Sequence, residues 1–163
     1  MKHTQVKTCR FLLAAFMIAY LLILSGCTQK AVVTPKPCEE VAAAIAAGQV
    51  FRELTPQDMR EIVAYLQVTE DDLTDAAFWM DASAATVDMI AVLTAKDSEA
   101  LKRVQEDMDW FLGDITEVYR GYVPEEIPKL ENPVMETRGL QLVFVLCNDA
   151  AAAKASLEEA WKP

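Results

Sequence analysis

The stretch Val87-Asp-Met-Ile-Ala-Val-Leu-Thr94 is almost entirely apolar and rich in β-branched residues, and a long helical pattern begins just after it at Asp97. A run of this kind indicates a strand buried in a sheet. From Asp97 to about Tyr119 the apolar residues recur every three or four positions, which is the spacing of one helix face. The segment predicts a strand and then an amphipathic helix lying on a sheet, with a coiled-coil seam to a partner as the alternative. The helical stripe consists of Leu101, Val104, Met108, Phe111, Ile115, Val118 and Tyr122.

The same order occurs near the C-terminus. The segments 134–137 and 140–147 form a predicted hairpin around Arg138-Gly139, and Asp149 precedes an alanine-rich helix that extends to about Trp161. Upstream, residues 75–81 alternate between apolar and polar and can form a hairpin with 87–94. Two successive strand–strand–helix units predict an α+β fold. We expect a four-stranded, mostly antiparallel sheet with both helices packed on one face.

Short helices precede this arrangement. Cys38–Ala47 has Glu39 and Glu40 in its first turn and Gly48 after its end, as expected for a helix. Thr55 and Pro56 suggest the N-cap and first position of a second helix, and Thr69 precedes a further turn at 70–72. We expect these N-terminal helices to cover the second face of the sheet.

The first 26 residues have the pattern of an export signal. Residues 1–10 contain three basic residues and no acidic one, and 14 apolar residues follow from Phe11 to Leu24. As a helix this run would extend about 21 Å, which is short for a bilayer span of about 30 Å. Leu24-Ser25-Gly26-Cys27 resembles the bacterial lipobox, in which the cysteine is lipidated and becomes the N-terminus. The alternative is an ordinary signal peptide in which the cysteine has no role.

These observations divide the chain into three predicted parts. Residues 1–26 are predicted to be a lipoprotein signal peptide that is removed. Residues 27–37 are predicted to be a tether lipidated on Cys27, and residues 38–163 a single α+β domain. An anchor with two or more acyl chains holds a protein stably at a membrane. We therefore expect the domain at the outer, extracytoplasmic face of the cell membrane.

Charge and composition exclude several function classes. The chain has a net charge of −10, and loss of residues 1–26 would leave 12 basic and 25 acidic residues, a net charge of −13. Such a surface does not bind nucleic acid, which requires clustered basic residues. It would also be repelled by anionic lipid headgroups, so the lipid alone should contact the membrane. The only histidine, His3, belongs to the export segment.

The residues available for catalysis are few. Without a histidine, the mature chain cannot form a Ser-His-Asp or Cys-His arrangement. Its glycines are scattered, so it has no dinucleotide or phosphate loop, and no spacing of metal ligands is present. We expect no cofactor and no metal. Carboxylate pairs at 70–75, 106–114 or 125–126 could serve a glycoside hydrolase, but a solvated acidic face explains each cluster more simply.

Two further groups of residues are candidates for sites. Cys38 and Cys147 could form a disulfide in an exported protein, the alternative being two buried thiols. A candidate interaction surface combines aromatic, proline and acidic side chains. It consists of Trp79, Tyr122, Pro124, Glu125 and Glu126. For each of these residues a structural role is the alternative: Trp79 covered by the N-terminal helices, and Tyr122 with Pro124 forming a corner at the helix end.

The order of segments from about residue 60 to 161 resembles the family called domain of unknown function 4358. The resemblance rests on Ala95-Lys-Asp-Ser-Glu-Ala100, the long helix, Tyr122-Val-Pro-Glu-Glu126, Leu130-Glu-Asn132 and the strand Leu142–Leu146. Tyr122–Glu126 is the most specific of these elements. Gly139–Gln141 departs from the pattern, because an aromatic residue is expected nearby. The resemblance implies a bacterial lipoprotein and supplies no activity.

Two functions from different classes remain. The first is a non-catalytic binding or interaction module that recognises a protein or another envelope component. The second is a carboxylate-based hydrolase of envelope glycan, which would need two convergent carboxylates about 5–10 Å apart in a cleft. The lack of histidine and of any strong nucleophile favours the first.

Overall fold

The computed structural model describes residues 34–48, 51 and 53–162. The predicted signal peptide, the lipidated Cys27 and tether residues 28–33 lie outside these residues. The helices are α2 (Cys38–Ala47), α3 (Met59–Leu66), α4 (Ser98–Tyr122), α5 (Ile127–Leu130) and α6 (Ala150–Ala160). Two 3₁₀ turns are η1 (Glu70–Asp72) and η2 (Pro124–Glu126). The strands are β1 (Thr55–Pro56), β2 (Leu73–Met80), β3 (Met89–Ala95), β4 (Val134–Arg138) and β5 (Gln141–Leu146).

The strands form one antiparallel sheet in the order β1-β2-β3-β5-β4. The two predicted hairpins, β2–β3 and β4–β5, are present and join through β3 and β5. Every residue of β3 and of β5 is buried, as expected for central strands covered on both faces. The α+β class is confirmed.

The prediction of four strands was wrong, because β1 is a fifth. Thr55 and Pro56 pair with Met80 and Trp79 at the edge of the sheet instead of beginning a helix. The helix α3 begins at Met59, where the side chain of Asp58 accepts a hydrogen bond from the backbone of Glu61 and the Glu61 side chain accepts one from the backbone of Asp58. This reciprocal capping box outweighs the Thr-Pro signal three residues earlier.

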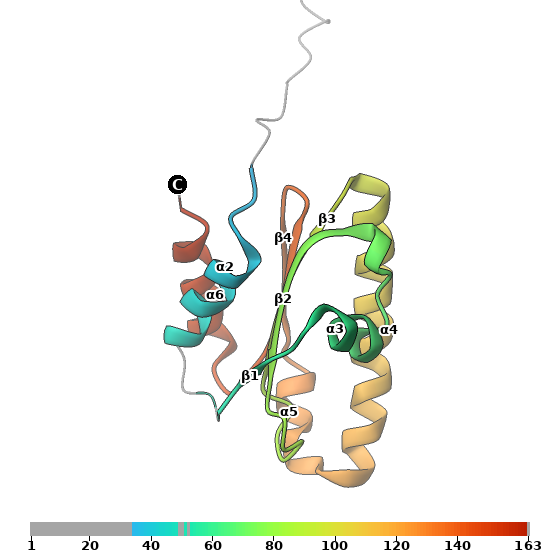
Figure 1. The fold of residues 1–163 in the computed structure, drawn as a ribbon. Helices are drawn as coiled ribbons and strands as arrows, with labels where there is room; N and C mark the ends of the chain where they lie inside the picture. The colour runs from blue at the N-terminus through green and yellow to red at the C-terminus, as the bar shows by residue number, and fades with distance from the viewer. Residues whose placement is uncertain (1–33, 49–50, 52, 163) are drawn as a thin grey trace, which may run out of the picture. The chain divides into compact units, whose positions relative to one another are not determined.

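The two faces of the sheet are covered by different helices, as Figure 1 shows: α3 and α4 lie on one side and α2 and α6 on the other. The first core packs Phe78, Leu93 and Phe144 against α3 and α4. The second packs Ile90, Val92 and Val143 against α2 and α6. The two strand–strand–helix units therefore place their helices on opposite faces, and the expectation that both helices share one face was wrong.

The long helix follows its predicted apolar stripe as far as Ile115. In its last turns the prediction was wrong, because Val118 and Tyr122 are 56% and 75% exposed and Tyr119 is buried in their place. The side chain of Asp97 accepts hydrogen bonds from the backbone N–H groups of Glu99 and Ala100 and so caps the N-terminus. The helix lies on the sheet, as the simpler of the two interpretations predicted. Among the described residues, no helix combines the length and the apolar composition that a bilayer span requires.

Candidate functional site

The loop between β2 and β3 is folded around the carboxylate of Asp81. Asp81 Oδ1 accepts hydrogen bonds from the Ser83 backbone N (2.9 Å) and Oγ (2.5 Å). Asp81 Oδ2 accepts from the Thr86 backbone N (3.2 Å) and Oγ1 (2.9 Å). Burial alone would raise the pKa of Asp81, but the bonds from Ser83 and Thr86 outweigh it and hold the pKa below its usual value. A loop of small residues is thereby given a fixed shape.

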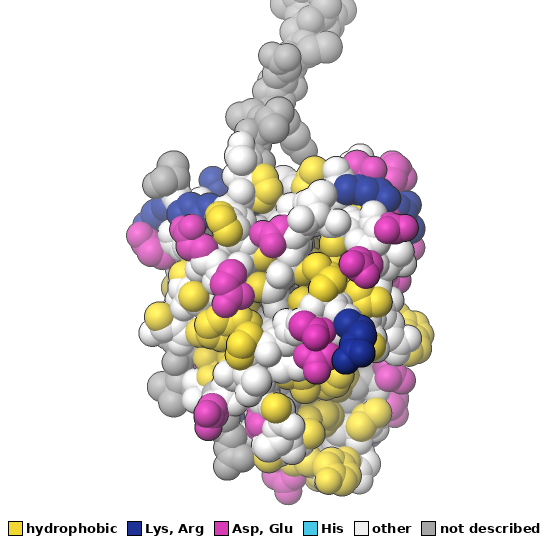
Figure 2. Space-filling model, viewed as in Figure 1, with side chains coloured by type: hydrophobic (Ala, Val, Ile, Leu, Met, Phe, Trp, Pro, Cys, Tyr) yellow, Lys and Arg dark blue, Asp and Glu magenta, His cyan; other side chains and the backbone are white. Residues whose placement is uncertain are grey.

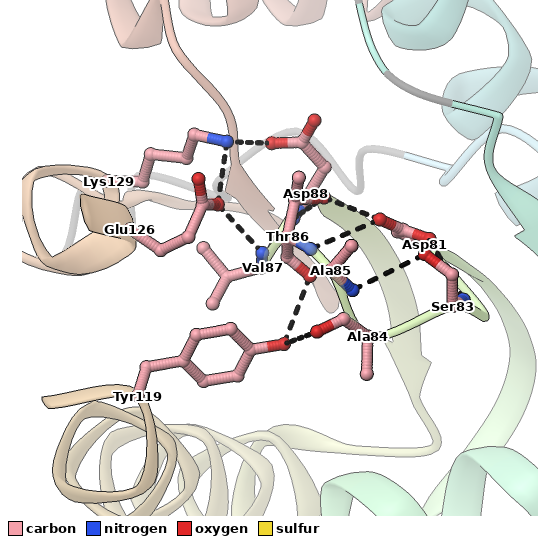
Figure 3. Close-up of polar contacts among 10 residues, drawn as sticks. All are labelled: Asp81, Ser83, Ala84, Ala85, Thr86, Val87, Asp88, Tyr119, Glu126 and Lys129. Carbon is pink, nitrogen blue, oxygen red and sulfur yellow. Dashed lines mark hydrogen bonds and ion pairs between the residues drawn. The ribbon is translucent and has the colours of Figure 1, made fainter. Parts of the chain in front are cut away.

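A buried lysine connects this loop to the segment after α4 (Figure 3). Lys129 Nζ lies 2.7 Å from Asp88 Oδ1 and 2.7 Å from Glu126 Oε2. Glu126 Oε2 also accepts a hydrogen bond from the Val87 backbone N at 2.9 Å. Burial lowers the pKa of Lys129, yet the bonds to Asp88 and Glu126 raise it by more, so the pKa lies above its usual value. The lysine is therefore charged and pairs with both carboxylates.

Tyr119 from α4 completes the same cluster. Its hydroxyl donates to the carbonyl oxygens of Thr86 at 3.0 Å and Ala84 at 3.4 Å. Ala84 has a φ of 52°, in the left-handed region that residues other than glycine rarely adopt. Burial raises the pKa of Tyr119 to about 12, so this hydroxyl keeps its proton. The 81–88 loop is thus bonded both to α4 and to the segment that follows α4.

Beside this cluster is an open depression of about 530 Å³, which we call the end depression. Its lining combines hydroxyl, amide, carboxylate and ammonium groups with a few apolar side chains. The lining residues are Phe51, Ala85, Thr86, Asp88, Val123, Glu125, Glu126, Lys129 and Asn148. Such a lining suits a ligand that offers several hydrogen-bonding groups.

The depression also contains the closest carboxylate pair of this region. Because Asp88 Oδ1 and Glu126 Oε2 each lie 2.7 Å from the same lysine nitrogen, they are at most about 5.4 Å apart. Retaining glycosidases hold their two carboxyl groups about 5–5.5 Å apart. The Lys129 ammonium, however, occupies the space between them. The Asp88 and Glu126 side chains are only 3% and 12% exposed. The arrangement is suited to holding the chain in place, with both carboxylates engaged by the lysine.

Four residues of the predicted interaction surface lie together at this end. Glu125 and Glu126 line the depression, Pro124 begins η2, and Tyr122 is 75% exposed at the end of α4. Trp79 does not join them. It lies on β2, partly buried against the second core, and its indole N–H donates to Glu39 of α2 at 3.2 Å.

The two cysteines are free, buried thiols, so the structure has no disulfide between Cys38 and Cys147. Cys38 Sγ lies 3.2 Å from Thr94 Oγ1 and near the start of β5, where Gln141 Nε2 is 3.7 Å away. Cys147 follows the last residue of β5, about 20 Å along the strand. A disulfide requires Cα atoms within about 7 Å, so this separation excludes it. Burial raises the pKa of Cys38 to about 12.

Gln141 fixes the described N-terminal segment at the opposite end of the sheet from the depression. Its Nε2 donates to the Lys36 backbone oxygen (2.9 Å) and to Thr94 Oγ1 (3.1 Å), and its Oε1 accepts from Trp161 Nε1 (2.8 Å). The Cys38 backbone N donates to Asp75 Oδ2 at 2.8 Å. Residues 36–38 and the end of α6 are thus bonded to the central strands.

A second ion cluster lies at the same end as Gln141. Asp72 accepts two hydrogen bonds from Arg103, at 2.7 Å and 2.6 Å, and lies 3.2 Å from Lys96 Nζ. The hydrogen bond from Arg103 is the main cause that lowers the pKa of Asp72 to about 2. This cluster connects η1, the end of β3 and α4.

The sequence interpretation missed Asp88, Lys129 and Asp81 as members of the cluster. Asp88 is a charged residue in an otherwise apolar stretch, which is a weak sign of a special role. Glu126 and Lys129 are spaced i, i+3, which is a weak sign of an ion pair. Their meeting depends on tertiary structure. Among the described residues, no group of three or more acidic, cysteine or histidine side chains is arranged to hold a metal ion.

Comparisons with known proteins give one match. The model of a family described as Domain of unknown function (DUF4358) matches residues 48–147, which include β1 to β5, the long helix and most of the end depression. Neither the curated proteins nor the solved structures contain a significant match. Because the family model covers more than half of the chain, the protein belongs to the DUF4358 family.

Proposed function

We propose that this protein is a lipoprotein anchored to the outer face of the cell membrane through Cys27, and that it is a binding module and not an enzyme. Its ligand-binding surface in this proposal is the end depression, and its ligand an envelope component with many hydroxyl groups, such as wall glycan. The observation that carries the proposal is the position of the depression. It lies at one end of the sheet, and residues 36–38 are held beside Gln141 at the other end.

The two ends of the sheet support this arrangement. Met80 and Met89 pair near the depression, whereas Leu73 and Ala95 pair near the tether. Strands of this length separate the ends by about 20–25 Å. A lipid on Cys27 would attach the domain by the tether end, so the depression would face away from the bilayer. A binding surface for the envelope would have to point in that direction.

The chemistry of the depression supports binding more than hydrolysis. Glu125 and Asn148 offer a carboxylate and an amide, which can bond sugar hydroxyls. The carboxylate pair that would serve a hydrolase is the one engaged by Lys129, and Glu126 is bonded to the backbone as well. A retaining mechanism needs one protonated acid and one nucleophile with access to the sugar, and a shared ammonium ion opposes both.

Membrane anchorage is tested by Cys27→Ala in the full-length chain. The wild type should remain with membranes after a carbonate wash, because two or more acyl chains give stable anchoring. The variant should lose the lipid mass and should be found in the soluble fraction if it is processed. Metabolic labelling with a fatty acid provides the direct readout. A Cys27→Ala protein of mature size that stays fully in the membrane fraction would contradict the lipid anchor.

Binding and hydrolysis are separated by one assay on purified cell-wall sacculi. We expect the wild type to sediment with sacculi and to release no reducing ends. Replacing Glu125 and Asn148 by Ala should reduce sedimentation at least several-fold, whereas Glu106→Ala and Asp109→Ala on the exposed side of α4 should not change it. Release of reducing ends that is lost in Asp88→Asn would favour the hydrolase instead, and no sedimentation of the wild type would overturn the proposal.

A further inference from the structure

The edge strand β2 is only partly covered by its outer neighbour. The short β1 pairs with Trp79 and Met80, and the Gln57 backbone N donates to the Phe78 backbone oxygen at 2.8 Å. From there the chain turns away into α3, whose N-cap is Asp58. Residues 73–77 of β2 have no strand beside them among the described residues. We call residues 73–77 the open edge.

The backbone of the open edge presents groups that a further strand could bind. Along a strand in an antiparallel sheet, the backbone N–H and C=O groups of successive residues point alternately toward the strand on one side and toward the strand on the other. Because the Phe78 carbonyl points outward to Gln57, the N–H and C=O groups of Ala76 also point away from β3. No described residue bonds to these groups of Ala76. They form the template that an extended peptide uses when it adds to a sheet.

A small apolar hollow lies just beyond the open edge, beside Phe78 and Met80 of β2. It has a volume of about 310 Å³ and is lined by Gln57, Glu61, Ala64, Tyr65, Phe78 and Met80. Tyr65 is 37% exposed and its ring lies 5.5 Å from that of Phe78. Figure 2, which views the molecule as Figure 1 does with β1 and β2 toward the reader, shows apolar side chains gathered between the two helical layers. A hollow of this kind can receive one side chain of a bound strand.

Acidic side chains flank the open edge on both layers. Glu39 and Glu40 lie on α2, Asp75 lies on the strand itself, and Glu70 and Asp71 immediately precede it. Of the nearby cations, Lys36 pairs with Glu40 at 3.9 Å and Lys96 pairs with Asp72, and the exposed Arg60 lies on α3 next to Glu61. A negative surface of this kind attracts a basic partner and repels an acidic one.

We propose that the open edge of β2 binds an extended, basic segment of a partner protein, which adds to the sheet as a strand beside residues 73–77. Main-chain hydrogen bonds to Ala76 hold this segment, one apolar side chain of the segment enters the hollow beside Phe78, and its Lys or Arg side chains meet the acidic flanks. This site is separate from the end depression and goes beyond the function proposed above. A second copy of the same chain fits less well, because each mature chain would carry a net charge of −13.

The test measures binding of a fluorescent octapeptide of alternating Lys and Val to the full-length protein purified from membranes in detergent. We expect binding to be at least tenfold weaker when alternate backbone amides of the peptide are N-methylated, because the peptide then lacks the donors that a sheet edge requires. A Glu-Val octapeptide should not bind. These two comparisons use only the wild-type protein, so their result does not depend on whether a substituted protein folds.

Protein variants then locate the site. Ala76→Pro removes the outward N–H at an edge position where proline is tolerated, and should weaken binding at least tenfold. The double variant Glu40→Lys with Glu70→Lys should weaken it about tenfold, whereas Glu106→Lys with Asp109→Lys, which changes the net charge equally on α4, should weaken it less than threefold. The proposal would be overturned if the Lys-Val peptide did not bind, if the N-methylated peptide bound equally well, or if Ala76→Pro left the affinity unchanged. It would also be overturned if the protein formed dimers that persist when the peptide is added. Sedimentation with sacculi should be unaffected by Ala76→Pro, so this result and the one for the end depression are independent.

Discussion

Lys129 is the residue on which the end of the molecule near the depression depends. Its ammonium joins Asp88, the residue before β3, to Glu126 of η2, and the Lys129 side chain is only 8% exposed. Two buried carboxylates with one buried cation are stable only while the cation remains, since a charge without a partner is costly in a protein interior. Removal of the lysine should therefore cost more than its own contacts.

We expect Lys129→Met to lower the free energy of unfolding by about 3 kcal/mol, because Asp88 and Glu126 would be left buried without their cation. Urea denaturation at pH 7 measures this change. Lys162→Met, which breaks an exposed pair with Glu159, is the matched control and should have no measurable effect. Equal stability of the two variants would show that the Lys129 cluster is not a stabilising contact.

The contribution of Asp72 to the stability of the fold should depend on pH. Its pKa is lowered from 3.8 to about 2 in the folded protein, mainly by the hydrogen bond from Arg103. A carboxyl with a lowered pKa stabilises the fold fully above its unfolded pKa and loses that effect as the pH falls through the folded value. Asp72→Asn should thus reduce stability at pH 7, and the difference from wild type should shrink between about pH 4 and pH 2. Urea denaturation across this range tests it, and a constant difference would contradict the assignment.

The candidate site was only partly predictable from single residues. Tyr122–Glu126 stood out as the most specific element of the family resemblance, and the structure places that segment beside the depression. Asp88 and Lys129 are 41 residues apart, and no local pattern connects them. Trp79 was grouped with Tyr122 by residue type alone, and the alternation of β2 turns it toward α2 instead.

At the scale of elements, the β4–β5 hairpin shows how one turn sets a register. Arg138 pairs with Gln141, so the loop has two residues, and Gly139 has a φ of 62°. A positive φ at the first loop position is typical of a type II′ turn, which favours glycine there. Gly113 differs, because it is exposed within α4 and a Cβ atom there would meet nothing within 4 Å.

This contrast predicts opposite effects of the same substitution. Gly139→Ala should destabilise the protein by about 1–2 kcal/mol, because alanine is strained in the left-handed region. Gly113→Ala should stabilise it by about 0.5–1 kcal/mol, because alanine loses less backbone entropy in a helix. Thermal unfolding of both variants measures the changes. The same sign for both would show that backbone conformation at Gly139 is not the determining factor.

Elements with strong local signals were predicted well, and the others were not. The hairpins, α4 with its Asp97 cap and α6 with its Asp149 cap follow from periodicity and capping residues. The two-residue strand β1 has no periodicity to detect, and Pro56 suggests a helix start. The choice of face for α6 depends on its packing with α2 and the sheet, contacts between residues far apart in the chain that a local pattern does not encode.

The long distance between Cys38 and Cys147 predicts that the stability of the protein does not depend on reducing conditions. Both thiols are buried at opposite ends of β5, so the fold needs no disulfide. Adding a reducing agent should leave the melting temperature unchanged. Alkylation under denaturing, non-reducing conditions should modify both residues. A lower melting temperature after reduction would contradict this arrangement.

The pairing of β3 with β5 has a consequence for the order in which the chain folds. β3 is apolar on both faces, and the strand that covers its second edge is complete only at Leu146, more than fifty residues later. A nascent chain that ends before β5 would therefore expose an aggregation-prone strand. Folding of this protein should thus be a late event that follows synthesis of nearly the whole chain, and any factor that delivers the chain to its final site must keep β3 covered until then.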